Sequence, residues 1–227
     1  MNTLLLYLTG PMQAWGHRSR FDDRDTGLEP TRSGIIGLFC CALGIGRNGD
    51  LVQFADMRLG VRVDAEGQPM TDFHTAMRVA RAGGGIADTV TSHRHYLTDA
   101  RFLVGIGHED LALLRAWEAA LRNPVWPLYL GRKSCPPAGP ILLPNDPIRP
   151  SADVGQALCD EPWYRLRERE AKPEQVRLTL ETDDPQEGQA RADVPLSFES
   201  RRFTLRYLTH NYIPVKEGGQ WPCISHA

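Results

Sequence analysis

The sequence predicts an α+β protein whose first 125 residues alternate strands with two helices and whose remainder is richer in strands. Three observations support this class: short runs with period-two apolar alternation, one clearly amphipathic helix, and a change to proline-rich sequence after Pro124. The chain has 227 residues, of which 41% are hydrophobic and 24% are charged, as in an ordinary globular protein. This length allows one large domain or two small ones that share a core.

The elements near the N-terminus are well marked. Thr3 to Thr9 alternates as a strand with apolar side chains on both faces, and Gly10-Pro11 ends it. The charged, glycine-containing stretch from Met12 to Arg32 predicts a long loop. Ser33 is the expected N-cap of a helix that ends at about Leu43 or Gly44.

Strand signals return further along the chain. Met57 to Val63 and Thr71 to Val79 are predicted strands, whereas Arg81 to His93 contains three consecutive glycines and predicts a mobile excursion. Tyr96 to Ile106 is again a predicted strand, and Glu109 to Arg122 carries a leucine stripe with helical spacing. This order is close to the ferredoxin-like pattern of RNA-recognition modules, although it also fits other α+β folds.

Beyond Pro124 the texture of the sequence changes. Residues 126–150 are rich in proline and predict a connecting segment with a basic loop. Ser151 to Ala171 is a predicted helix, and the polar tail from Lys216 is expected to be loose. Residues 151–227 therefore predict a small β-rich C-terminal part, with strands at Gln175–Glu181, Leu196–Phe198 and Phe203–Tyr207.

Several functional classes are disfavoured. The N-terminus lacks a basic start, and the longest apolar run, Ile35 to Ile45, is too short to cross a bilayer, so we expect a cytoplasmic protein without membrane contact. The five cysteines lack CxxC spacing, which argues against a disulfide framework or a zinc ribbon. His93 and His95 form an HxH pair without an obvious third ligand, so neither a metal nor another cofactor is predicted.

The net charge of −2 argues at first against a nucleic-acid partner, but the charge is unevenly distributed. Asp160 to Asp193 holds ten acidic and six basic residues, a balance of −4, which leaves +2 for the rest of the chain. Arginine, which suits phosphate contacts, outnumbers lysine 23 to 3, as it would in any protein from a GC-rich genome. Charge alone therefore does not decide the partner.

Four short segments combine glycines with basic or aromatic residues, as RNA contacts require. The first segment, GPMQAWG, spans Gly10 to Gly16 and is followed by His17, Arg18 and Arg20. The second, PTRSGIIGL, spans Pro30 to Leu38 and begins a helix whose free N–H groups can bind an anion. The third comprises Asp72–Arg81 and Ser92–Leu97 around the excursion, and the fourth is the basic loop YLGRKSCPP, Tyr129 to Pro137. Each segment alone also fits an ordinary turn, helix start or solvated loop.

Catalysis has weaker support from the sequence. Tyrosine, histidine and lysine can cleave RNA by general acid–base chemistry, and Tyr7, His74 and Lys133 offer these groups, but the sequence does not bring them together. No GxSxG, HExxH or paired-carboxylate signature is present.

Taken in order, five stretches resemble the CasD family of type I-E Cascade subunits, within the repeat-associated mysterious protein group. They are GPMQAWG, PTRSGIIGLFCCALGI, DFHT, HYLTDARFLVGI and YLGRKSCPP. The resemblance covers roughly residues 4–137, and VPLSFESRRFTLRYL is the best match in the C-terminal third. The resemblance implies a ferredoxin-like N-terminal domain over residues 1–125, with a β-hairpin thumb at about residues 78–96, and a small β-rich C-terminal part.

The resemblance also implies a function. The chain would be a non-catalytic subunit that caps the 5′ handle of CRISPR RNA, contacts the CasC and CasA subunits, and meets target DNA only through the complex. The implied handle contacts are His17, Arg18, Arg32, Ser33, Gly34, His74, Arg132, Lys133 and Ser134. The implied contacts at the base of the thumb are Arg78, Arg94 and Tyr96.

Two other interpretations stay open. In type I-C systems a related subunit cuts the precursor RNA itself, which would make this chain a metal-independent endoribonuclease. The GPMQAWG and YLGRKSCP forms favour the type I-E alternative, in which the separate CasE enzyme cuts the RNA. A purely structural assembly subunit with incidental RNA contact is the third possibility.

Overall fold

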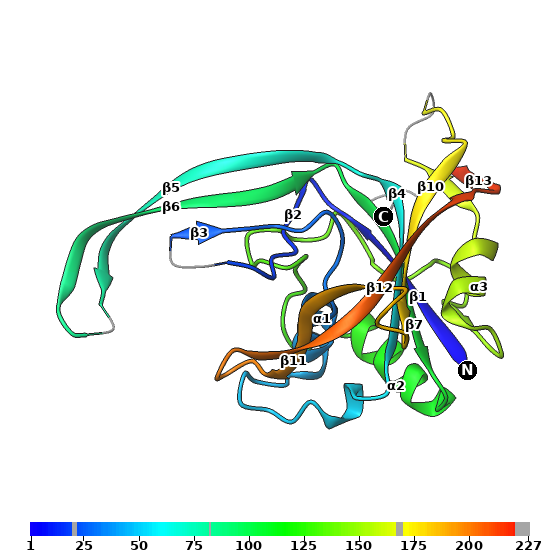
Figure 1. Cartoon of the computed structure of the whole chain (residues 1–227), viewed down its shortest axis with the longest axis horizontal. Coiled ribbons are helices and arrows are strands. Elements are labelled where there is room, and N and C mark those ends of the chain that lie inside the picture. Colours follow the sequence, from blue (N-terminus) through cyan, green and yellow to red (C-terminus); the bar gives the residue numbers. More distant parts are fainter. Residues whose placement is uncertain (20–21, 82, 167–169, 221–227) are drawn as a thin grey trace.

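A seven-stranded antiparallel sheet forms the centre of the protein (Figure 1). The computed structural model describes residues 1–19, 22–81, 83–166 and 170–220. The strand order across the sheet is β11-β12-β10-β4-β7-β1-β8. The strands are β1 (Asn2–Thr9), β4 (Arg58–Ala65), β7 (Arg101–His108), β8 (Ile148–Arg149), β10 (Gln175–Thr182), β11 (Gln189–Ser197) and β12 (Arg202–Pro214). The chain is thus an α+β protein dominated by strands, as the sequence predicted.

Helices cover both faces of this sheet. Alternate residues of β1 point to opposite sides, and Leu4 and Leu6 join the core beneath α1 (Arg32–Leu43) and α2 (Leu111–Arg122). Leu5 and Tyr7 face the other way and pack beneath α3 (Val154–Asp160). All four β1 side chains are essentially buried, which confirms the prediction of a strand covered on both faces.

The first helix begins two residues earlier than the sequence suggested. Thr31 is its N-cap, with extended backbone angles and a hydroxyl that accepts a hydrogen bond from the Gly34 N–H at 3.2 Å. The predicted cap, Ser33, lies inside the first turn, so that prediction was wrong. The predicted end is confirmed, because Gly44 adopts a left-handed conformation at φ 71° and closes the helix onto the Cys40 carbonyl.

The two hydroxyl residues at this helix start give a direct test. Thr31→Ala removes the acceptor of the Gly34 N–H and should lower the free energy of unfolding by about 1 kcal/mol. Ser33→Ala should change it by less than about 0.5 kcal/mol, because Ser33 caps nothing. Urea denaturation of both variants measures the difference, and a larger loss for Ser33→Ala would contradict the assignment.

A long hairpin occupies the region that was predicted as a strand and a mobile excursion. β5 (Gln68–Ala80) and β6 (Ile86–Thr98) pair from Gln68↔Thr98 to Ala80↔Ile86. The excursion predicted at residues 81–93 is therefore mostly strand, since its threonine- and valine-rich part outweighs the preceding glycines. Figure 1 shows this β5–β6 hairpin reaching far from the sheet.

The base of the hairpin meets the loop that follows β1. Two short strands of this loop, β2 (Met12–Gln13) and β3 (Asp23–Arg24), pair with β6. The predicted strand from Tyr96 to Ile106 is divided into β6 and β7 by a turn at Asp99, whose φ is 55°.

The C-terminal strands continue the central sheet. β10 pairs with β4 through Arg177↔Val63 to Leu180↔Gly60, and β12 and β11 follow it. β10 matches its prediction, whereas β12 is longer than predicted and the run expected at Leu196–Phe198 is only the end of β11.

The predicted helix over Ser151–Ala171 is reduced to α3, because Pro162 forces the chain into the extended strand β9 (Trp163–Arg165). In the tail, β13 (Glu217–Gln220) pairs in parallel with β9, and the predicted loose residues 221–227 lie outside the described residues.

The four described cysteines are free thiols, as predicted: Cys40, Cys41, Cys135 and Cys159. Cys223 lies outside the described residues. Helices of the described part reach 12 residues, and none is long and apolar enough to span a membrane.

Candidate nucleic-acid interface

Three of the four predicted segments meet at the buried indole of Trp15. The Ala14 N–H donates to the Leu130 carbonyl at 3.1 Å, which joins the GPMQAWG segment to the basic loop. At the start of α1, a Cβ on Gly34 would lie 2.8 Å from the Trp15 ring. In the basic loop, a Cβ on Gly131 would lie 1.6 Å from the Ala14 carbonyl oxygen. These glycines allow the segments to pack closely against one another.

The side chain of Gln13 holds this indole in place. Its amide nitrogen donates to the Ala100 carbonyl at 2.8 Å, and its amide oxygen accepts from the Trp15 indole at 3.1 Å. Gln13 and Trp15 are both buried, so the centre of GPMQAWG is part of the core. This part of the segment therefore fits the ordinary turn that the sequence left open.

Arg132 joins the basic loop to the third segment. Its guanidinium lies over the Tyr96 ring with Cζ 4.8 Å from the centroid and donates to the His95 carbonyl at 3.0 Å. It also donates to the carbonyls of Arg24 and Asp25, at 2.7 and 2.9 Å. All four predicted segments are thereby connected around Trp15 and the base of the hairpin.

Several predicted contacts present polar groups to solvent at this junction or on the hairpin. Arg18, Lys133 and Ser134 are exposed near Trp15, whereas Arg78 is exposed on the hairpin. His74 and Arg94 are half-buried on the hairpin. Arg24 on β3 is also exposed and was missed, because the charged loop around it gave no signal that distinguishes one arginine from another.

His17 is half-buried beside the carboxylate of Asp25. The N–H groups of His17 and Arg18 donate to Asp25 Oδ2 at 3.2 and 2.9 Å. Burial, followed by the charge of Arg191, lowers the pKa of His17 below its usual value. Its imidazole is therefore mostly neutral near pH 7, so that a contact to RNA would be a hydrogen bond rather than an ion pair.

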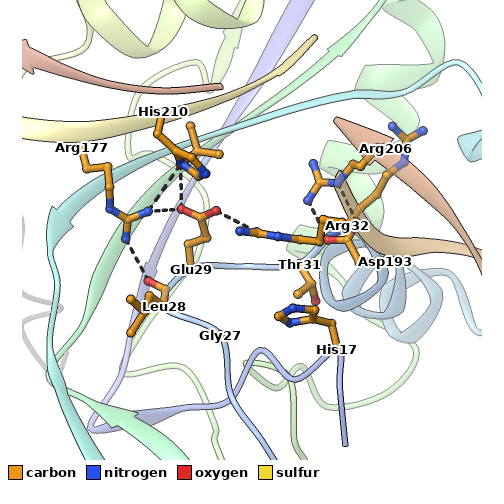
Figure 2. A network of polar contacts seen from close by, with 12 residues as sticks. His17, Gly27, Leu28, Glu29, Thr31, Arg32, Arg177, Asp193, Arg206 and His210 are labelled. Carbon is orange, nitrogen blue, oxygen red and sulfur yellow. Dashed lines mark hydrogen bonds and ion pairs between the residues drawn. The ribbon is translucent and has the colours of Figure 1, made fainter. Parts of the chain in front are cut away.

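The anion position at the start of α1 is filled by the protein itself (Figure 2). The Arg32 N–H donates to Asp193 Oδ2 at 2.9 Å, and Arg206 holds the same carboxylate at 2.6 and 2.7 Å. The buried guanidinium of Arg32 donates to Glu181 at 3.0 Å and to two backbone carbonyls. In this arrangement neither group reaches an RNA phosphate, which corrects the sequence-based assignment of Arg32: a helix start prefers an anion, and β11 supplies one.

A second buried carboxylate, in the loop that leads into α1, joins that loop to the C-terminal strands (Figure 2). Glu29 accepts from Arg191 at 2.7 Å and from the Thr179 hydroxyl at 2.7 Å, and it also contacts Arg177. The ring of His210 lies 2.9 Å from the same hydroxyl. Since Glu29 is 2% exposed, these partners replace the water that it loses.

This cluster predicts an acid-sensitive fold. Burial by itself would raise the pKa of Glu29, but Arg191, Thr179 and Arg177 outweigh it, so the net pKa lies below its usual value. Such a group stabilises the protein above its unfolded-state pKa, about 4.3, and the contribution is lost as pH falls through the folded-state pKa. As the pH drops below about 4.3, the free energy of unfolding should therefore decrease, and it should decrease less steeply in Glu29→Gln. Urea denaturation at several pH values measures this, and an equal decrease in both proteins would contradict the role of Glu29.

The groups proposed for RNA cleavage are not assembled. Tyr7 is 1% exposed in the core beneath α3, and burial raises the pKa of its hydroxyl well above the ordinary value. His74 lies on the hairpin and Lys133 on the basic loop. A buried phenol cannot reach an RNA 2′-hydroxyl without rearrangement of the core.

The HxH pair has protein partners. His95 Nε2 lies 3.0 Å from Asp23 and its Nδ1 lies 2.9 Å from the Thr71 hydroxyl, while His93 packs against Phe73. Among the described residues, no three His, Cys, Asp or Glu side chains are grouped so that they could hold a metal ion.

Comparison with known families gives the identity of this arrangement. Residues 3–209, nearly the whole chain, match the family described as CRISPR-associated protein (Cas_Cas5). The chain belongs to the Cas5 family. The CasD resemblance read from five ordered stretches is confirmed, because a Cas5 relative named CRISPR system Cascade subunit CasD, from Escherichia coli strain K12, is 36% identical over 155 residues. That alignment covers 62% of this chain and 69% of the relative.

Solved structures agree with the Cas5 assignment. A chain described as a crystal structure of a Cas protein is 39% identical with a TM-score of 0.76, and the match covers 95% of this chain and 98% of that one. A chain of a CRISPR RNA-guided surveillance complex is 34% identical with a TM-score of 0.79, covering 94% of this chain and 90% of that one. This Cas5 protein is therefore a CRISPR defence protein of the Cascade type.

Proposed function

We propose that this Cas5 protein is a non-catalytic RNA-binding subunit that caps the 5′ handle of the guide RNA in a cytoplasmic Cascade complex. Its protein partners there would be CasC and CasA, and it would meet target DNA through the complex. The observation that carries the proposal is the junction of the four segments around Trp15 and Arg132. Its support from outside the chain is the relative named as a Cascade subunit and the similar chain of an RNA-guided surveillance complex.

Asp25 brings the exposed cations of two segments near one another. Its carboxylate accepts from the Arg18 N–H, and its carbonyl accepts from Arg132, the residue before Lys133. Arg18 and Lys133 are thus linked through Asp25 and Arg132. Both cations can therefore contact the same RNA backbone. The exposed hydroxyl of Ser134 adds a further donor.

The proposed RNA contacts involve fewer residues than the sequence suggested. We assign phosphate or base contacts to residues that are exposed or only half-buried: His17, Arg18, Ser33, His74, Arg78, Arg94, Lys133 and Ser134. Arg32, Gly34 and Tyr96 instead build the junction, since each is occupied by an internal partner.

We further propose that residues 1–125, completed by one strand from the connecting segment, form a ferredoxin-like domain with the β5–β6 hairpin as its thumb. The strand order β4-β7-β1-β8 with α1 and α2 on one face supports this, since a βαββαβ unit gives this order. The fourth strand, β8, then comes from the connecting segment 126–150, and residues 151–227 form the C-terminal part that extends the sheet.

The test combines the purified chain with labelled repeat RNA from the same locus, without metal, and follows binding and cleavage on one gel. We expect binding without cleavage. Replacing both Arg18 and Lys133 with glutamine should flatten the dependence of log K on log salt by about 0.7 for each phosphate that is no longer neutralised. The exposed Arg202→Gln, at the start of β12, is the control and should leave the slope unchanged.

The alternatives give different outcomes in the same test. Cleavage at one position that disappears in His74→Ala or Lys133→Ala would make the chain a processing endoribonuclease. Absence of RNA binding together with normal assembly into the complex would make it a structural subunit.

A further inference from the structure

Both Nη atoms of Arg132 donate to acceptors from two other segments. It donates to the His95 carbonyl on β6 and to the carbonyls of Arg24 and Asp25, in and just after β3. Its flat face lies over the Tyr96 ring, with Cζ 4.8 Å from the ring centroid. These contacts direct three of its five N–H donors into the protein, although the sequence pattern places this arginine in an exposed basic loop.

The hairpin needs support of this kind at its base. A two-stranded ribbon is only marginally stable by itself, and the β5–β6 hairpin exposes large apolar side chains such as Phe73 (62%) and Met77 (77%). Its other attachments at this place include the short pairings of β2 and β3 with β6, and His95, which bridges Asp23 and Thr71. Arg132 adds an attachment from a different part of the chain, because it lies in the loop after α2.

We propose that Arg132 is a positioning residue that fixes the β5–β6 hairpin relative to the basic loop, and that it makes no phosphate contact itself. Lys133, next in the chain, is the loop's outward-facing cation. The RNA part of this inference rests on the proposed function, since hairpin and loop must contact one RNA for their relative position to affect its binding.

The chemistry of the site requires arginine rather than any cation. A guanidinium has a planar fork of five donors and an aromatic-compatible face, which together match carbonyls from separate strands and the Tyr96 ring. The lysine ammonium is a compact point charge and cannot cover the same acceptors and the ring at once. Arg132→Lys therefore preserves the charge but removes the attachment.

The first arm of the experiment measures the hairpin directly. Spin labels at Gly84→Cys, in the hairpin turn, and Asn123→Cys, after α2, report their distance in the full chain, with Cys159→Ser and Cys223→Ser removing competing thiols. Arg132→Lys and Arg132→Gln should both broaden the distance distribution, whereas Lys133→Gln should leave it narrow. A distribution that stays narrow in both Arg132 variants would overturn the proposal.

The second arm measures RNA binding against salt. Both Arg132 variants should weaken repeat-RNA binding about tenfold, since the hairpin must then be ordered on binding, with an unchanged salt slope. Lys133→Gln should instead lower the slope by about 0.7. A lower slope in Arg132→Gln that Arg132→Lys restores would make Arg132 a direct phosphate contact and overturn the proposal.

The two arms separate this inference from the function on which it rests. If the unaltered chain binds no repeat RNA, the proposed function fails, while the distance distributions still decide whether Arg132 positions the hairpin. Far-ultraviolet circular dichroism of each variant confirms that the fold is retained, and the lysine variant provides the comparison if the glutamine variant does not fold.

Discussion

Gly131→Ala is expected to destabilise the protein by about 3 kcal/mol or more and to abolish RNA binding through the basic loop. An added Cβ would lie 1.6 Å from the Ala14 carbonyl oxygen, and Gly131 has a φ of 84°, which disfavours any other residue. Relief of this clash must separate the basic loop from the segment of Trp15. Lys133 and Ser134 then lose their place at the junction of the segments.

Gly84→Ala is the matched control for this effect. Gly84 has nearly the same φ, 89°, but nothing lies within 4 Å of its added Cβ. It should cost only about 1 kcal/mol, the penalty of the left-handed backbone alone. Urea denaturation gives the free energy of unfolding of both variants, and their difference measures the cost of the close approach of the loop to Ala14. Similar losses of stability in the two variants would refute this packing.

Arg62→Leu should lower the free energy of unfolding by about 3–5 kcal/mol, because it leaves the buried carboxylate of Asp64 without its counter-charge. Both side chains are fully buried, and the guanidinium contacts both oxygens of Asp64, at 2.7 and 3.1 Å. Its remaining donors hold the carbonyls of Leu158, Glu161 and Pro162 at the end of α3. This one side chain thus fastens α3 to β4.

A surface pair on the same strand provides the comparison. Arg58 binds Asp183 in the same two-pronged manner, at 2.7 and 2.6 Å, but these side chains are 42% and 80% exposed. Arg58→Leu should cost less than about 1 kcal/mol. The double variant Arg62→Leu, Asp64→Leu should recover part of the loss of Arg62→Leu, because two apolar groups leave no unpaired charge. Equal effects of Arg58→Leu and Arg62→Leu would contradict the role of burial.

The stretches that suggested the RNA interface turned out to combine two kinds of residue. In GPMQAWG and YLGRKSCPP, the glycines, Gln13 and Trp15 make the segments fit together, whereas Lys133, and Arg18 just after the first segment, face solvent. A sequence pattern shows both kinds at once. It can therefore locate the candidate interface without telling which of its residues would touch RNA.

The sequence by itself determined the class of the fold, most of its elements and the family. β1, α2 and β10 were predicted near their true bounds, because apolar period and helix-ending residues act within a few positions. Order and spacing of the five stretches sufficed for the family because each stretch is a local pattern.

Tertiary structure alone decided what the arginines do. Arg32 meets Glu181 149 residues away and Arg62 meets the Leu158 carbonyl 96 residues away, while Arg18 remains in solvent. Arg132 likewise reaches the Arg24 carbonyl 108 residues away. The extent of the long β5–β6 ribbon also follows from pairing between two strands. A guanidinium is equally suited to a carboxylate, a carbonyl or a phosphate, so its role follows from which acceptor the folded chain places beside it.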